Sequence, residues 1–405
     1  MNPNDLVLIL NNFFLTFTSI LFEALPWVIL GTTLAGVVQE VPSRRSPAVM
    51  LALSTLIVTL FLSPFHRIEV LASYPPVALY ALNIGGAIGL ALLVLWLLWL
   101  AQPVVDYLMH LLGRHRFLAI AMSGFLGAVI PMCECGIIPV TRRLLRKGMP
   151  LSCCVTYILA GPIVNVVVLL TTYAAFAPRE GMDGPTGQDM APQMSGLWMM
   201  GLRAVLGYTV AVVTGVIAEF MHRRYGNALL TPLTMPSGLP VVDGDDALPL
   251  DLWKSVSNMA ETALHDFVDI TAYLILGALF AATIKVFLSN EWIAEQSKDH
   301  AILAILIMMG LAIVITLCSE ADAFVAANFI TLRPAAKLAF LVLGPMLDFK
   351  LIFMYRRVFR PRLMYTIIAA VVVQVFLYSL TTHLIWENYP WKTKSDPTAQ
   401  VTPAK

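Results

Sequence analysis

The chain has 405 residues, of which 59% are hydrophobic and only 13% are charged, and its mean hydropathy is +0.79. Soluble domains are nearer half apolar and a quarter charged, so this composition excludes a soluble protein and predicts a polytopic membrane protein. The net charge of +1 and the absence of a long basic tract from the sequence give no sign of a nucleic-acid partner.

Apolar segments of helical length recur along the whole chain. The first of them lacks a positive n-region and a small-residue cleavage site, so we expect a retained helix and not a signal peptide. The segments at 117–131 and 301–317 are short for spanning helices and suit re-entrant or broken elements. The ten segments lie at 6–38, 47–63, 76–108, 117–131, 151–177, 197–221, 262–288, 301–317, 335–355 and 363–385.

A polar stretch at 222–261 divides the chain into two membrane halves. It contains TPLTMPSGLPVVDGDDALP, whose content of Pro, Gly and Asp is typical of a linker, and we expect this linker to be cytoplasmic. The first half, 1–221, carries two additional helices at about 47–108. The second half covers 262–388, and the tail at 389–405 is expected to be disordered.

Basic clusters determine the expected topology, because Lys and Arg favour cytoplasmic loops. If both short segments are hairpins that return to their own side, every basic cluster lies inside. The bundle then has about eight spans, two re-entrant or broken hairpins and both termini outside. Ten full spans would instead place Arg114–Arg116 outside, and this alternative stays open. In either case the expected fold is an all-α integral membrane bundle.

Three short motifs occur in both halves in the same order, which predicts an internal repeat. In the expected topology the first repeat starts outside and the second inside, so the repeats are inverted. Many secondary transporters have this architecture, with substrate bound near the midplane where broken helices meet. The motif pairs are Glu23–Gly31 with Asp269–Gly277, Cys133–Cys135 with Cys318–Glu320, and Gly161–Asn165 with Gly344–Asp348.

Cysteines are the first candidates for chemistry. Cys133 and Cys135 form a Cys-x-Cys pair between prolines, and such thiolates bind soft ions such as Cu(I), Zn(II) or trivalent arsenic. Cys318 would supply a third sulfur if the two motifs face each other. The alternative is that each cysteine is a small buried hydrophobe. Cys153 and Cys154 lack a repeat mate and are expected to be packing residues.

Carboxylates recur at the same broken points, and they are costly at membrane depth unless they face water, a cation or a partner. We expect Glu134, Glu320 and Asp322 to take up protons, to pair with Arg142 or Arg143, or to bind a cation. The alternative is that they are solvated at the membrane interface. Glu23 and Asp269 lie deeper in their helices, where a proton-coupling role and a structural polar role both stay open.

Gly161-Pro162 and Gly344-Pro345 interrupt apolar helices and free backbone carbonyls, which then need a cavity or a partner. Asn165 and Asp348 lie three residues beyond each proline, about one helical turn along, and are expected to face the same opening. These positions complete the predicted substrate site. The alternative is an ordinary proline kink with a capping polar residue.

No enzyme motif accompanies these residues in the sequence. There is no Gly-x-Ser-x-Gly, Walker or His-Glu-x-x-His motif, and the seven histidines form no ligand cluster. We therefore expect a secondary-active permease and not an enzyme, without a cofactor or a nucleotide-driven step of its own. A thiol oxidoreductase that uses Cys133 and Cys135 is the weaker alternative, since a Cys-x-Cys pair would close a strained ring.

Three stretches carry a resemblance to a known family. MCECGIIPVTRRLLRKG, LAGPIVN and LCSEADAFVAANF, in this order, resemble the YraQ-like predicted permeases over about residues 10–385. Relatives of that family include the organoarsenical efflux permease ArsP and a group described as copper/zinc effluxers. The resemblance implies an inner-membrane permease in which Cys133, Cys135 and Cys318 bind a soft thiophilic ion.

These observations together predict a proton-coupled exporter of a soft metal ion or a trivalent organoarsenical, located in the inner (plasma) membrane. The lipid bilayer and a small thiophilic substrate are the expected partners, and homo-oligomerisation stays open. The alternative function is a membrane metal-trafficking factor that hands a thiol-bound ion to a partner without net transport.

Overall fold

The computed structural model describes residues 116–129, 133–177, 195–231, 301–329 and 332–388, apart from 147 and 316–317, with scattered positions at 11–32 and 261–283. Within these ranges the regular elements are helices, apart from one isolated bridge between Leu230 and Phe359. The helices expected at about 47–108, the linker beyond residue 231 and the tail from residue 389 lie outside the described residues.

The first half contains two long apolar elements. α6 and α7 together cover 151–175 and are long and apolar enough to cross a membrane, with one break at Asn165. α8 has 30 residues and continues beyond the boundary expected at 221, until Gly226 adopts a φ of 57° that a residue without a Cβ accepts readily. The helices are α4 (Arg116–Val129), α5 (Glu134–Arg146), α6 (Leu151–Val164), α7 (Val166–Ala175), α8 (Gly196–Tyr225) and the 3₁₀ helix η3 (Gly226–Leu229).

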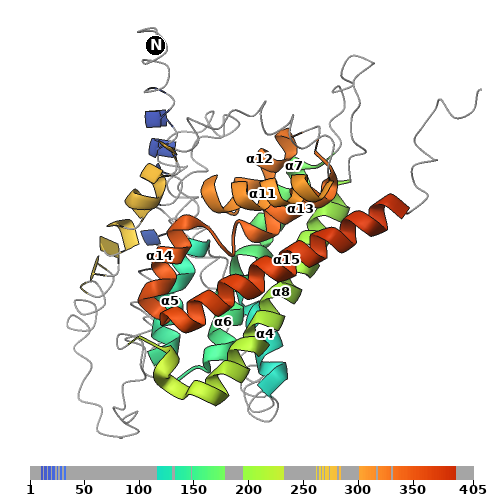
Figure 1. Cartoon of the computed structure of the whole chain (residues 1–405). Helices are drawn as coiled ribbons and strands as arrows, with labels where there is room; N and C mark the ends of the chain where they lie inside the picture. Colours follow the sequence, from blue (N-terminus) through green and yellow to red (C-terminus); the bar gives the residue numbers. More distant parts are fainter. Residues whose placement is uncertain are drawn as a thin grey trace, which may run out of the picture.

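The second half contains a third element of membrane-spanning length, the 28-residue α15, which crosses the front of Figure 1. The apolar segment expected at 335–355 forms two helices, because the first ends at Leu343 and residues 344–348 form a turn and irregular backbone before the second begins at Phe349. The helices are α11 (Ala301–Ile315), α12 (Asp322–Asn328), α13 (Pro334–Leu343), α14 (Phe349–Val358) and α15 (Pro361–Asn388).

Burial separates a central helix from peripheral ones. Nearly every residue of α6 is buried, as expected for a helix that is apolar on all sides. α8 and α15 instead expose large apolar side chains, among them Trp198 and Phe220 on α8 and Val373 and Leu377 on α15. Large exposed apolar surfaces of this kind fit contact with lipid.

The first residue of α4 and the start of α6 meet at one carboxylate. Arg116, at the start of α4, donates a hydrogen bond to Glu219 at 2.9 Å, and Ser152, the second residue of α6, donates to the same side chain at 3.0 Å. The chain therefore leaves this end of α8 along α4 and is back at the same end where α6 begins. A 14-residue helix is about 21 Å long, less than the hydrocarbon thickness of a bilayer. This geometry agrees with a hairpin that returns to its own side.

α8 and α15 pack against each other and run antiparallel. Nε2 of Gln374 donates to Oγ1 of Thr214 at 3.1 Å, and the guanidinium of Arg362 lies 5.9 Å from the ring centroid of Tyr225. Position 214 thus lies opposite 374 and position 225 opposite 362. Antiparallel packing of these two helices is what an inverted repeat requires, because they occupy equivalent places in the two halves.

Other helix contacts also correspond between the two halves. α4 packs on α6 and α8, just as α11 packs on α13 and α15. α5 contacts α14, whereas α12 contacts α7, so each cysteine-motif helix meets the broken helix of the other half. The inverted repeat remains a prediction, and these contacts support it.

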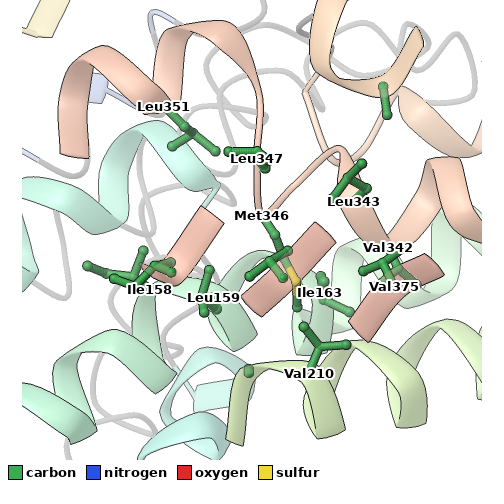
Figure 2. Close-up of a cluster of buried hydrophobic side chains, with 14 of the residues drawn as sticks. Ile158, Leu159, Ile163, Val210, Val342, Leu343, Met346, Leu347, Leu351 and Val375 are labelled. Carbon is green, nitrogen blue, oxygen red and sulfur yellow. The ribbon is translucent and has the colours of Figure 1, made fainter. Parts of the chain in front are cut away.

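One apolar core joins the two halves. Figure 2 shows Met346, from the break between α13 and α14, close to Ile163 of α6, with Val210 of α8 and Val375 of α15 in the same cluster. All four side chains are buried, so the broken part of the second half packs directly on the central helix of the first. The polar residues at the breaks are therefore held by a packed apolar frame.

Candidate functional site

Polar side chains converge where four helices begin or break. α5 begins after Cys133, α6 and α7 are separated at Asn165, α12 follows Cys318 after a turn, and residues 344–348 separate α13 from α14. Because α5 contacts α14 and α7 contacts α12, each junction combines residues of both halves (Figure 1).

The two cysteine motifs have the same local backbone. The carbonyl of Cys133 accepts hydrogen bonds from the N–H groups three and four residues later, both at 3.2 Å. The carbonyl of Cys318 accepts the equivalent bonds at 2.9 and 3.1 Å. Each cysteine thus lies at the entry to a helical turn, where free N–H groups give the region a partial positive charge.

Cys133, Glu134 and Cys318 form a buried group of possible metal ligands. One ligand atom from each residue lies within 4.8 Å of the other two. The residues are 0%, 1% and 6% exposed, respectively. Within the part of the chain that the structure describes, this is the one such group of at least three Cys, His, Asp or Glu residues. It joins the α5 entry of the first half to the α12 entry of the second.

Lys350 holds the carboxylate of this group. Its Nζ donates a hydrogen bond to Oε1 of Glu134 at 2.8 Å and lies 3.4 Å from Oδ2 of Asp348. All three side chains are almost fully buried, so the ion pairs are largely shielded from water. A buried charge of either sign is costly without its partner, so these three residues depend on one another.

Arg203 of α8 is the buried cation next to the other cysteine motif, which begins at Cys318. Its guanidinium is fully buried, donates to Oγ1 of Thr172 at 2.7 Å and to the carbonyl of Ser319 at 3.1 Å, and lies 4.0 Å from Oδ2 of Asp322. Thr172 belongs to α7 and Asp322 to α12, so this arginine connects the two halves. Each cysteine motif therefore has one buried cation beside its carboxylate.

Asn165 and Asp348 are both N-caps of the helices that follow them. Oδ1 of Asn165 accepts the N–H of Val167 at 2.9 Å, and Oδ1 of Asp348 accepts the N–H of Leu351 at 2.6 Å. The capping alternative weighed from the sequence thus accounts for one oxygen of each side chain. The second break has one further hydrogen bond, in which the hydroxyl of Tyr355, a residue of α14, donates to the carbonyl of Met346 at 2.9 Å.

Several buried polar atoms near these junctions have no hydrogen-bond partner among the described residues. Leaving such an atom unsatisfied costs about 1–3 kcal/mol, so these atoms are suited to bind water or a polar solute. They are Oε2 of Glu134, Nδ2 of Asn165, Nε of Arg203, Oγ of Ser319 and Oδ2 of Asp322.

The two Gly-Pro motifs act through backbone packing. A Cβ at Gly344 would lie 2.9 Å from Oδ2 of Asp322, and a Cβ at Gly161 would overlap the Ile137 side chain of α5. Both glycines therefore allow a cysteine-motif helix to approach the broken helix of its own half. Pro162 and Pro345 are buried and lack the N–H that would continue the helical bonding, which promotes the break that follows each of them.

Other predicted positions lie apart from the site or outside the described residues. Glu23 and Asp269 lie outside the described residues, and so does the side chain of Cys135, whose backbone belongs to α5. Glu320 is partly buried next to Ser319. Cys153 is a packing residue between α4 and α6 with Ala119 and Ile120, and Cys154 is buried in the main core.

Lys350 and Arg203 are site residues that we did not identify from the sequence. Arg203 was detectable, because a single arginine inside an apolar stretch of spanning length needs a partner. Lys350 was less evident, because it follows Asp348 by two residues within a segment that continues into basic residues. Its pairing with Glu134 links positions 216 residues apart, which no local pattern encodes.

These observations define a multi-pass helical membrane protein with a buried, thiol-containing polar site between its two halves. The family model ArsP_1, described as "Predicted permease", matches residues 87–384. The chain belongs to this predicted permease family, which makes it a membrane transporter. As the sequence predicts, it is a multi-pass protein of the plasma membrane.

Similar proteins from other organisms support the same class. "UPF0718 protein YcgR" of Bacillus subtilis (strain 168) is 33% identical over 277 residues, which are 68% of this chain and 85% of that protein. A protein of Streptococcus mutans named "Putative two-component membrane permease complex subunit" is 27% identical over 277 residues, 68% of this chain and 83% of its own length. No solved structure matches the chain.

Proposed function

We propose that the protein is a secondary-active, proton-coupled exporter of a soft thiophilic substrate, which binds at Cys133, Glu134 and Cys318. The observation that carries this proposal is the mutual distance of at most 4.8 Å between ligand atoms of these three buried residues. Two sulfurs bound to one tetrahedral zinc ion lie about 3.8 Å apart, so a small side-chain adjustment would bring the two thiols onto one ion.

Two substrate types fit a site with two thiols. A Zn(II) or Cu(I) ion would take both thiolates, and Zn(II) would also accept the carboxylate. A trivalent monoorganyl arsenical, R–As(OH)₂, has two exchangeable oxygen ligands, which two thiols replace with release of two water molecules. Cys135 remains part of the proposed site as the further thiol that a three-sulfur substrate such as arsenite would need.

Proton coupling is supported by the chemistry of the same groups. Thiols must lose their protons to bind a metal ion, so metal binding and proton release are linked at this site. Glu134, Asp322 and Asp348 add carboxylates in positions that are costly for uncompensated charge. A substrate cation and protons can therefore replace each other without leaving these buried groups unbalanced.

Alternating access is supported by the relation between the halves. The antiparallel α8 and α15 and the exchanged contacts of α5 and α12 agree with an inverted repeat whose substrate site lies between the repeats. Movement of one half against the other would change which side of the membrane reaches Cys133 and Cys318. We include Asn165, Asp348 and the two Gly-Pro motifs in the proposed site as the elements that position it.

Counterflow in proteoliposomes made from the purified full-length protein tests the proposal. Zn(II), Cu(I) and methylarsonous acid are assayed in turn, and a pH-sensitive dye inside the vesicles reports proton movement. We expect Cys133→Ser and Cys318→Ser to abolish counterflow of the transported substrate, because a hydroxyl is a poor ligand for soft ions. Cys153→Ser and Cys154→Ser, at equally buried cysteines outside the site, serve as matched controls and should retain it.

Three results would decide between the functions. Full counterflow in both Cys133→Ser and Cys318→Ser, at normal abundance, contradicts the proposed site. Stoichiometric binding that needs both cysteines but gives no counterflow supports the trafficking alternative. Net transport down a substrate gradient that gives no signal from the pH-sensitive dye removes proton coupling and leaves the thiol site intact.

A further inference from the structure

One carboxylate of the proposed site has two competing uses. Glu134 contributes a ligand oxygen to the group with Cys133 and Cys318, and its Oε1 is also the acceptor for the Lys350 ammonium at 2.8 Å. A substrate cation that binds this carboxylate therefore meets a resident cation. In a buried site two positive charges at contact distance repel each other far more strongly than in water.

The helix that carries Lys350 gives no reason for a lysine at this position. Lys350 is the second residue of α14, and the N-terminal end of a helix carries a partial positive charge that disfavours a cation. The aspartate that caps this helix, Asp348, is favourable there, but the lysine is not. The contacts that offset the unfavourable position are those with the two carboxylates.

We propose, as an extension of the proposed function, that the Lys350 ammonium is a tethered competitor of the substrate cation for Glu134. In the empty site it neutralises Glu134. When a thiophilic cation binds to Cys133, Glu134 and Cys318, the ammonium moves to Asp348. Its Nζ already lies 3.4 Å from Oδ2 of Asp348, so the change of partner needs only a small side-chain movement.

This exchange matters for the return of the empty transporter. A carrier that has released its substrate must change conformation with the site vacant, and an uncompensated buried carboxylate would oppose that step. The ammonium supplies the missing charge. Without it, substrate should bind more tightly, and the empty protein should return more slowly.

Zinc binding and two transport assays on the purified full-length protein test this proposal. We expect Lys350→Met to bind Zn(II) about tenfold more tightly or more, because it removes a like charge from the site. Lys350→Met should also slow net transport more strongly than it slows counterflow, since counterflow does not need the empty protein to return. Lys350→Arg should bind Zn(II) more weakly than the natural protein, because a guanidinium can hold a carboxylate through two hydrogen bonds.

Lys337→Met is the matched control. Lys337 is another buried lysine, but its Nζ lies 5.7 Å from the ring centroid of Phe176, whereas the lysine paired with Glu134 and Asp348 is Lys350. This variant should leave Zn(II) affinity unchanged. An equal effect of Lys337→Met and Lys350→Met would assign the change to general loss of charge and would overturn the proposal.

The outcomes separate this inference from the proposed function. Zn(II) affinity and net transport that are unchanged in Lys350→Met overturn the tethered competitor, while cysteine-dependent counterflow still supports the exporter. If Lys350→Met does not fold, unchanged or tighter Zn(II) binding in Lys350→Arg overturns the inference equally. If the natural protein neither binds nor exchanges any of the thiophilic substrates, both proposals fail.

Discussion

A β-carbon at Gly277 would lie 2.8 Å from the β-carbon of Lys350. Gly277 ends the second Ile-Leu-Gly motif of the predicted repeat, so this sequence signal has a packing role: it lets a neighbouring helix approach the first turn of α14. The same approach is supported three residues after Gly277 and one residue before Lys350, where Phe280 stacks on Phe349 at 4.1 Å between ring centroids.

Gly277→Ala should therefore destabilise the protein. The added methyl group meets the backbone side of Lys350, and overpacking of this kind costs about 1–3 kcal/mol. Thermal unfolding in detergent measures the effect. Gly310→Ala is the control, because a Cβ at Gly310 would meet nothing within 4 Å. That control should be neutral or stabilising by up to about 1 kcal/mol, and equal behaviour of both variants would contradict the packing role.

Gly161→Ala should be rescued by a second substitution. Its new methyl group would overlap Cδ1 of Ile137, and the next nearest atom, Cγ1 of Ile137, is 3.8 Å away. Ile137→Val removes that Cδ1, so the double variant should be more stable than Gly161→Ala alone. Gly127→Ala offers the contrast, because its Cβ would meet the backbone of Gly161. No gain in the unfolding temperature of the double variant would contradict this packing.

Asp348 should tolerate asparagine better than alanine. Asparagine keeps the side-chain oxygen that caps α14, and the equivalent break in the first half is already capped by Asn165. Alanine loses the cap, which costs about 1 kcal/mol. Thermal unfolding of Asp348→Asn and Asp348→Ala gives the difference. Equal loss of stability in the two variants would show that the charge next to Lys350, and not the cap, is the important feature.

Cross-linking can test the antiparallel packing of α8 and α15. Thr214→Cys combined with Gln374→Cys should react with a short bismaleimide, because the two natural side chains are hydrogen-bonded at 3.1 Å. With a protease site inserted at 232–260, a cross-linked chain stays in one piece after cleavage. Thr214→Cys with His383→Cys is the control pair, since position 383 lies about 13 Å further along α15. Preferential cross-linking of that pair would contradict the arrangement.

The sequence was informative about helices and about the places where they break. The short segments 117–131 and 301–317 became α4 and α11, because their apolar runs end at residues that disfavour a lipid-facing helix. The Gly-Pro motifs marked both broken helices, since proline cannot continue the bonding pattern. α8 extends past 221 because its last turn is basic, which suits the negative end of a helix.

The composition of the site was less accessible from the sequence. Cys133 and Cys318 were singled out by their recurrence in the two halves, and the structure brings them together with Glu134. The partners of the carboxylates could not be identified from neighbouring residues in the sequence. We considered Arg142 and Arg143 as partners of Glu134, whereas its hydrogen-bond donor is Lys350, which approaches only after the two halves have packed. Long-range pairing of this kind depends on tertiary structure.

The two helix breaks differ in mechanical terms. Two hydrogen bonds bridge the break between α13 and α14, from the Tyr355 hydroxyl to the carbonyl of Met346 and from the N–H of Leu347 to the carbonyl of Leu343, so we expect these two helices to move together. The break between α6 and α7 is a single residue, Asn165, whose ψ of 127° interrupts the helix. Bending of the first half can therefore concentrate in two torsion angles. We therefore expect Asn165 to be the hinge about which α7 moves, together with the face that meets α12.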